Sequence, residues 1–148
     1  MRLYGVLNAC YLQQFAVLSL YKRCNLEKPD GVKQKLNDLK IYELRNKLGA
    51  HSPDYKNKQD DKKEDSIESY VIIRISAKRY KFKYINNEST EGEWVDLKEY
   101  LEEHLRLIVD LLDKIYEKSI KTLHKGENSK LQKHMQKLSE LRILKHNM

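Results

Sequence analysis

The nine residues Leu44-Arg45-Asn46-Lys47-Leu48-Gly49-Ala50-His51-Ser52 end a stretch of helical periodicity and bring three polar side chains within two turns. Each helical residue advances about 100°, so Arg45 and His51 would lie about 120° apart on a continuous helix. Gly49 can adopt a positive φ at a helix end, and Pro53 disfavours helical geometry at the residue before it. We therefore expect the helix to end near Gly49 and His51 to turn back toward Arg45.

The chemistry of these side chains suits a phosphate-containing ligand. Arg45 is a permanent cation with a planar fork that fits phosphate, and His51 titrates near neutral pH. Asn46 could hold either of them. In the structural alternative, Arg45 pairs with a carboxylate, Gly49 caps the helix and His51 lies at the negative end of the helix dipole. Spacing alone leaves both interpretations open and favours the structural one.

The pattern resembles the signature of the HEPN superfamily (higher eukaryotes and prokaryotes nucleotide-binding domains), in which an Arg and a polar residue precede a His by a few positions. Here Arg45 and Asn46 are followed by His51. The resemblance implies an all-helical, usually dimeric fold. Many members are metal-independent RNases of toxin–antitoxin, abortive-infection and CRISPR-associated antiviral defence systems. Toxins paired with nucleotidyltransferase antitoxins often carry a Tyr two positions after the His, where this chain has Pro53.

The resemblance also implies roles for the catalytic residues. His51 would be the general base or acid, Arg45 would stabilise the charge developing on the phosphate, and Asn46 would orient His51 or a phosphate oxygen. The two motifs of a homodimer would face one another in a basic cleft. Because RNA supplies its own 2′-hydroxyl nucleophile, neither a metal nor another cofactor is expected.

Composition predicts one mainly α domain spanning residues 1–148. Hydrophobic residues make up 40% of the chain and charged residues 34%, with only five Gly and two Pro, which disfavours a turn-rich all-β fold. The formal net charge of +7 suggests an anionic partner, although a solvated lysine-rich surface accounts for it equally well. Cys10 and Cys24 are interpreted as free thiols of a cytoplasmic protein. Gln13 and Gln14 interrupt the first apolar stretch, so we expect no signal peptide or membrane span.

Periodicity predicts a HEPN-like bundle of four to five helices. Residues 2–24 form a helix that is apolar nearly all round, which indicates either the central helix of the fold or a helix shared between the core and a second subunit. A second helix runs from about residue 32 to residue 48 and carries the motif at its end. Residues 52–69 are almost wholly polar and predict a mobile charged loop.

Residues 70–85 predict a β-hairpin inserted between helical segments. The second half alternates, with Tyr80, Phe82 and Tyr84 on one face and basic residues on the other. A two-stranded ribbon is marginal alone, so its aromatic face should pack on the helices and leave the basic row exposed. The candidate RNA-binding residues are Lys47, Arg74, Arg79, Lys81 and Lys83.

After a turn at residues 86–92, Trp94 leads into a long amphipathic helix in which Leu97, Leu101, Leu105, Ile108, Leu112, Ile115 and Tyr116 follow the helical period. His104 lies between these positions and is interpreted as a packed or surface histidine. A final helix at residues 127–146, capped by Ser129, carries a leucine- and methionine-rich stripe that docks on the core or on a partner. No Cys/His cluster has metal-ligand spacing.

The preferred function is a metal-independent endoribonuclease, with RNA and a second copy of the chain as partners and an antitoxin or effector protein as a further possible partner. One alternative is a non-catalytic dimeric module of the same fold that binds nucleotide, nucleic acid or a protein. The other needs no resemblance: a basic helical adaptor whose last helix engages a partner.

Overall fold

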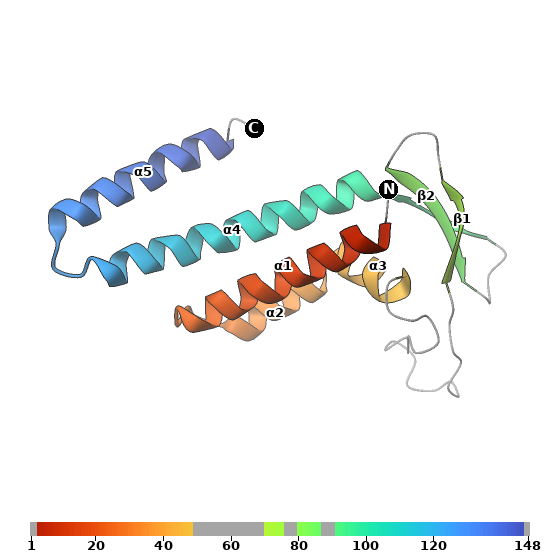
Figure 1. Cartoon of the computed structure of the whole chain (residues 1–148), viewed down its shortest axis with the longest axis horizontal. Coiled ribbons are helices and arrows are strands. Elements are labelled where there is room, and N and C mark those ends of the chain that lie inside the picture. The colour runs from red at the N-terminus through yellow and green to blue at the C-terminus, as the bar shows by residue number, and fades with distance from the viewer. Residues whose placement is uncertain (1–2, 49–69, 76–79, 87–90, 147–148) are drawn as a thin grey trace.

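The computed structural model describes residues 3–48, 70–75, 80–86 and 91–146, and within them the fold is mainly helical with a small antiparallel sheet (Figure 1). The elements in chain order are α1 (Leu3–Arg23), α2 (Pro29–Asn37), α3 (Lys40–Leu48), β1 (Tyr70–Ile75), β2 (Lys81–Asn86), β3 (Glu93–Asp96), α4 (Leu97–Leu123) and α5 (Asn128–His146). The predicted mainly α architecture with a β insertion is confirmed. The predicted charged loop at 52–69 lies outside the described residues.

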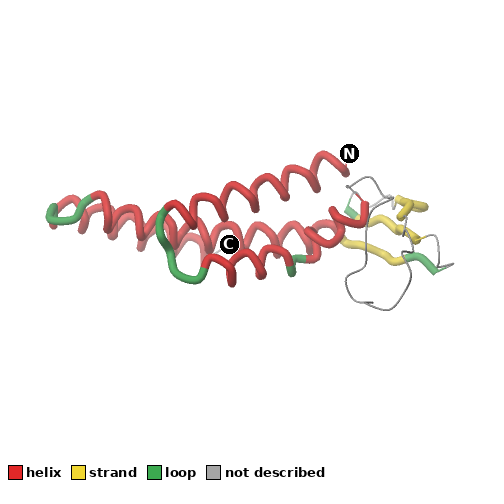
Figure 2. Tube along the Cα trace, turned by 90° about the horizontal axis from the view of Figure 1, so that it is seen from below, coloured by secondary structure: helices red, strands yellow, loops and turns green. Residues whose placement is uncertain are grey.

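The sheet lies at one end of a helical bundle, as both views show (Figures 1 and 2). Helix α1 contacts α2, α3 and α4, whereas α5 folds back beside α4 and makes its main contacts with that helix alone among the described elements. The core is therefore built around one face of α1, and the sheet closes the end of the bundle where α3 terminates and α4 begins.

Helix α1 buries one face and exposes the other. Its buried residues are Leu7, Cys10, Gln14, Val17 and Tyr21. The opposite face exposes large apolar side chains, including Leu12 at 63% and Phe15 at 64%. By length and composition α1 is one described helix that could cross a membrane, a test that the core helix of a soluble protein also passes. One sequence-based alternative was a helix with one face on the core and the other on a second subunit. The structure matches the part of this alternative that concerns a single chain, because one face of α1 packs on the core and the other, apolar face is exposed.

The single helix predicted for residues 32–48 is wrong, because the structure divides it into α2 and α3. The Asp38 N–H still bonds the Gln34 carbonyl, but two successive N–H groups, those of Tyr42 and Glu43, converge on the Leu39 carbonyl as a new helix begins. Leu39 is buried at the joint. Apolar spacing continues through the break because α2 and α3 both pack on α1, so periodicity alone did not reveal it.

The predicted hairpin is present as β1 and β2, but it belongs to a three-stranded sheet of order β1-β2-β3 in the described residues. Phe82 pairs with Val95 and Lys83 with Trp94, so residues 93–96 form a strand that the sequence analysis assigned to the approach to a helix. Phe82, Tyr84 and Val95 are buried, which confirms that the hairpin's aromatic face packs on the helices. Tyr80 instead precedes β2 and is exposed.

Helix α4 begins where β3 ends, and Asp96 serves as its N-cap by accepting a hydrogen bond from the Lys98 N–H at 3.1 Å. The buried positions of α4 include Leu97, Ile108 and Ile115. Leu105, Leu112 and Tyr116, which share the predicted period, are exposed instead. The apolar surface of α4 is therefore wider than the face that the core covers.

Helix α5 begins at Asn128, so Ser129 lies inside the helix instead of capping it. Leu138 is its buried contact, whereas Leu141 of the predicted stripe is exposed. Arg142 adds a polar tie, because its guanidinium bonds the carboxylates of Asp113 and Glu117 on α4 at 2.7 and 2.5 Å. The last helix, predicted to dock on the core or on a partner, thus packs mainly on α4.

Candidate functional site at the end of α3

The guanidinium of Arg45 is held in a fixed orientation at the surface of the bundle. Its Cζ lies 4.3 Å from the centroid of the Tyr11 ring on α1, and its Nη1 donates a hydrogen bond to Asn46 Oδ1 at 3.1 Å. An Arg on an aromatic face gains cation–π and stacking energy. Two different elements, α1 and α3, therefore position the Arg side chain, and Asn46 holds it as the sequence suggested it could.

Arg45 has no carboxylate partner among the residues that the structure describes, since none places an oxygen within the 4.0 Å limit of an ion pair with it. Its Nε is buried and lacks a hydrogen-bond acceptor in the same part of the chain. A buried donor without a partner costs roughly 1–3 kcal/mol. Within the described residues, therefore, no ion pair engages the guanidinium of Arg45.

His51 cannot be placed relative to Arg45, because Gly49, His51 and Pro53 lie outside the described residues. Helix α3 is described as far as Leu48. The turn of His51 back toward Arg45 therefore stays a prediction.

Lys47 occupies a network that joins α3 to the sheet. Its ammonium lies 2.6 Å from a Glu43 carboxylate oxygen and donates to the Tyr84 hydroxyl at 3.3 Å. It also lies 5.7 Å from the ring centroids of both Tyr70 and Tyr84. Burial acts to lower the pKa of Lys47, but the contact with Glu43 raises it overall. The structure thus gives this proposed RNA contact an intramolecular role as well.

The hydroxyl of Tyr84 completes this network by donating to Glu93. Burial first, and then the hydrogen bond to Glu93, raise the pKa of Tyr84 far above its usual range. The phenol therefore remains a neutral donor across the physiological pH range, and the sheet is anchored next to the end of α3 that carries Arg45.

The remaining basic candidates lie on the sheet. Lys81 is exposed and forms an ion pair with Asp96 at 3.3 Å, and Lys83 is half-buried. Arg74 is the register partner of Lys83 in β1, and Arg79 lies outside the described residues. The structure therefore brings Arg74, Lys81 and Lys83 into one sheet, apart from the Arg45–Asn46 pair on α3.

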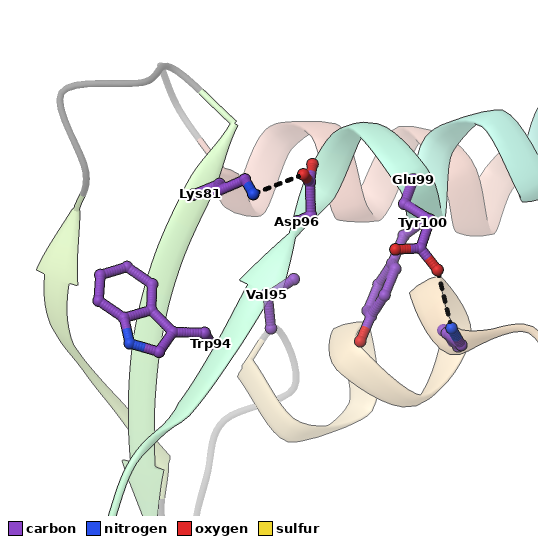
Figure 3. A pocket seen from close by; sticks show the side chains of 7 residues that line it. Lys81, Trp94, Val95, Asp96, Glu99 and Tyr100 are labelled. Atoms are coloured by element: carbon purple, nitrogen blue, oxygen red, sulfur yellow. Dashed lines mark hydrogen bonds and ion pairs between the residues drawn. The ribbon is translucent and has the colours of Figure 1, made fainter.

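A pocket of about 480 Å³ lies between the sheet and the starts of α3 and α4 (Figure 3). Two ion pairs line it, Lys81 with Asp96 and Lys40 with Glu99, the latter at 3.0 Å. The hydrogen bond to Glu99 raises the pKa of Lys40. Because its charged groups already neutralise one another, this pocket is a weaker candidate for an anion site than Arg45.

Two residues near these groups escaped the sequence analysis as site residues. Tyr11 supports Arg45 from a distant part of the chain, and no local pattern links the two. Trp94 is 49% exposed on the sheet, although a sole tryptophan is ordinarily expected to be a core residue. Among the described residues, no group of three or more His, Cys, Asp or Glu side chains could hold a metal ion.

Comparison of the chain with protein-family models, curated proteins and solved structures gave no significant match.

Proposed function

We propose that the protein is a HEPN-type, metal-independent endoribonuclease that acts as a homodimer. The observation that carries the proposal is the Arg45 guanidinium, oriented by Tyr11 and Asn46 and without a carboxylate partner in the described part of the chain. A preorganised cation that no anion of the described residues neutralises is suited to stabilising charge that develops on a phosphate.

In the proposed reaction the 2′-hydroxyl oxygen of RNA attacks the adjacent phosphorus and the bond from phosphorus to the 5′-oxygen breaks. The base, His51, takes the hydroxyl proton, and an acid, the same histidine or its counterpart in the second protomer, protonates the leaving oxygen. Arg45 binds the phosphate oxygens as negative charge accumulates. The products are a 2′,3′-cyclic phosphate and a 5′-hydroxyl.

The exposed apolar face of α1 supports the dimeric part of the proposal. Monomeric proteins seldom expose a large contiguous apolar surface, and α1 presents such residues along most of its length. Tyr11, which supports Arg45, also lies on α1. A second protomer that packs on α1 would thus contact the same helix that orients the Arg45 guanidinium through Tyr11. An antitoxin or effector protein is a further possible partner.

The test is cleavage of a long single-stranded RNA by the purified protein in EDTA. We expect His51→Ala to lose about 10²–10⁴-fold in rate, because that is the usual contribution of a positioned acid or base. Arg45→Ala should also lower the rate strongly and should weaken RNA binding, since the guanidinium contacts phosphate before the transition state as well as in it. The matched control is Arg106→Ala, which removes an exposed arginine from α4.

Cleavage that is equal in the wild type and both variants would identify a contaminating nuclease and refute the assignment. RNA binding without cleavage by the wild-type protein would favour the non-catalytic module of the same fold instead.

A further inference from the structure

The outer face of the sheet combines an exposed indole with basic side chains. Phe82, Tyr84 and Val95 point into the core. Side chains alternate along a strand, so Lys83 and its register partner Trp94 project from the opposite face. Figure 3 shows Trp94 pointing away from Val95 and Tyr100.

Glycine at position 92 shapes this face. A Cβ added there would meet the Lys83 Cε at 2.6 Å and the Ile85 Cγ2 at 2.7 Å. The end of the Lys83 side chain therefore lies over Gly92, two residues before Trp94, and the Tyr84 carbonyl oxygen, at 2.7 Å from the same added Cβ, also disfavours a larger residue there. A basic residue and an aromatic residue are thus register partners on neighbouring strands.

The surroundings of Trp94 extend the same chemistry. Lys81 lies two residues from Lys83 on β2, about 7 Å along the strand. The ion pair with Asp96 partly neutralises the charge of Lys81. Val71 and Ile73 of β1 add exposed apolar side chains. An aromatic ring with flanking lysines and an apolar surround matches a ligand that has flat apolar rings and negative charges.

We propose that this face binds single-stranded RNA, with one unpaired base stacked on Trp94 and neighbouring phosphates on Lys83 and Lys81. The inference rests on the proposed function in that RNA is taken as the ligand. It adds a preference for single-stranded over double-stranded RNA and names Trp94 as a contact residue. An unpaired base offers its face to an aromatic ring, whereas the bases of a duplex are already stacked on each other. The basic side chains favour a polyanion over an apolar protein surface.

The sole tryptophan provides a direct readout, because the intrinsic tryptophan fluorescence of the chain arises from Trp94 alone. The probe is a 2′-O-methyl oligouridylate of about 12 nucleotides, a length within the usual site sizes for single strands. Its blocked 2′-oxygen prevents cleavage by the proposed reaction, so binding is measured with the wild-type chain. We expect saturable quenching by the single strand and little change with a duplex of the same length.

Variants separate stacking from charge. Trp94→Ala should weaken binding of a labelled oligouridylate by about fivefold or more, and Trp94→Phe should recover part of the affinity. Lys83→Gln should reduce the slope of log affinity against log salt by about one. Tyr116→Ala and Lys118→Gln are matched controls on α4, where both residues are exposed, and should change neither quantity.

Binding of the oligouridylate without quenching, together with wild-type affinity in Trp94→Ala, would overturn the inference. Equal quenching by duplex and single strand would overturn the strand preference. Failure of the proposed function gives a different result, since quenching and loss of affinity in Trp94→Ala would then persist while unmodified RNA stays uncut. If the oligouridylate does not bind but unmodified RNA is still cleaved, the proposed function stands and the sheet face is excluded.

Discussion

The imidazole of His104 is completely enclosed between α1 and α4, with an exposed fraction of 0%. Its Nε2 lies 2.9 Å from Gln13 Oε1 and its Nδ1 lies 3.3 Å from Gln14 Nε2. These partners match a neutral ring that donates through Nε2 and accepts through Nδ1. The two glutamines that interrupt the apolar pattern of α1 therefore supply hydrogen-bond partners for both ring nitrogens of the buried His104. This histidine, interpreted from sequence as a packed or surface residue, is packed.

The enclosure of His104 predicts a dependence of stability on pH. Burial lowers the pKa of His104 from its ordinary value near 6.5. The unfolded chain then binds the proton more readily than the folded chain, so the contribution to stability is complete above about pH 6.5 and is lost as pH falls toward the folded-state pKa. We expect the free energy of unfolding to decrease below pH 6.5, with a slope from this group of at most about 1.4 kcal/mol per pH unit.

Urea unfolding of the wild type and of His104→Leu between pH 7.5 and 5.5 measures this contribution. The variant should be less stable by about 1–3 kcal/mol at pH 7.5, because the two glutamine amides lose their partner. Its slope against pH should be smaller, because the variant lacks the imidazole whose pKa burial lowers. An identical slope in both proteins would show that His104 does not cause the dependence.

At the level of elements, α5 is the least supported helix of the described fold. Its main contacts are with α4 alone, through Leu138 and through Arg142 with its two carboxylates. The His124 and His134 rings add a stack at the α4–α5 connection, with centroids 4.9 Å apart. An element with few buried contacts is expected to open locally before the rest of the chain.

Arg142→Ala should therefore increase amide hydrogen exchange in α5 by about two- to fivefold, because a partly exposed ion-pair network contributes modestly. Exchange in α1 should stay unchanged. Lys98→Ala is the control, since it removes an ion pair within α4 without touching α5. Uniformly faster exchange across all helices would contradict the local role of Arg142.

Local periodicity predicted those elements whose apolar residues recur at helical or strand spacing within a single segment of the chain. Helices α1, α4 and α5 and the first two strands belong to this group. The strand β3 was missed because its four residues are too few to show alternation and because its pairing with β2 is a tertiary contact. The break between α2 and α3 was missed because both pieces bury leucines against the same helix.

For the candidate site too, contacts between neighbouring residues were predictable from the sequence, whereas contacts between distant segments were not. Arg45 and Asn46 are adjacent in the chain, so their contact follows from local geometry. The stacking of Arg45 on Tyr11 and the use of Lys47 to anchor the sheet depend on packing between distant segments, which no local pattern encodes. The exposure of Trp94 likewise follows from which face of β3 the core covers.

For the whole molecule, the apolar face of α1 predicts a homodimer. Replacing Leu12 and Phe15 together by Glu should give a monomer in light scattering at micromolar concentration, because two charges would be buried in the interface. RNA cleavage should fall with the loss of the dimer. Stability of the isolated monomer should change little, since both side chains are exposed in the single chain.

The control for the dimer is Leu123→Glu, which places a charge at another exposed apolar position, at the end of α4. It should leave the molecular mass and the cleavage rate unchanged. A wild-type protein that is monomeric at the same concentration would exclude both the interface on α1 and a composite site.

The hydrogen bonds of Gln13 and Gln14 to His104 join residues about ninety positions apart, which affects the chain while it is being made. At about 5–20 residues per second, α1 leaves the ribosome roughly 5–18 s before its partner on α4 has been translated. During that interval α2 and α3 can already pack on α1, whereas the part of α1 that α4 covers in the fold stays open to solvent. The buried polar cluster of Gln13, Gln14 and His104 is therefore completed only after most of the described chain has been synthesised.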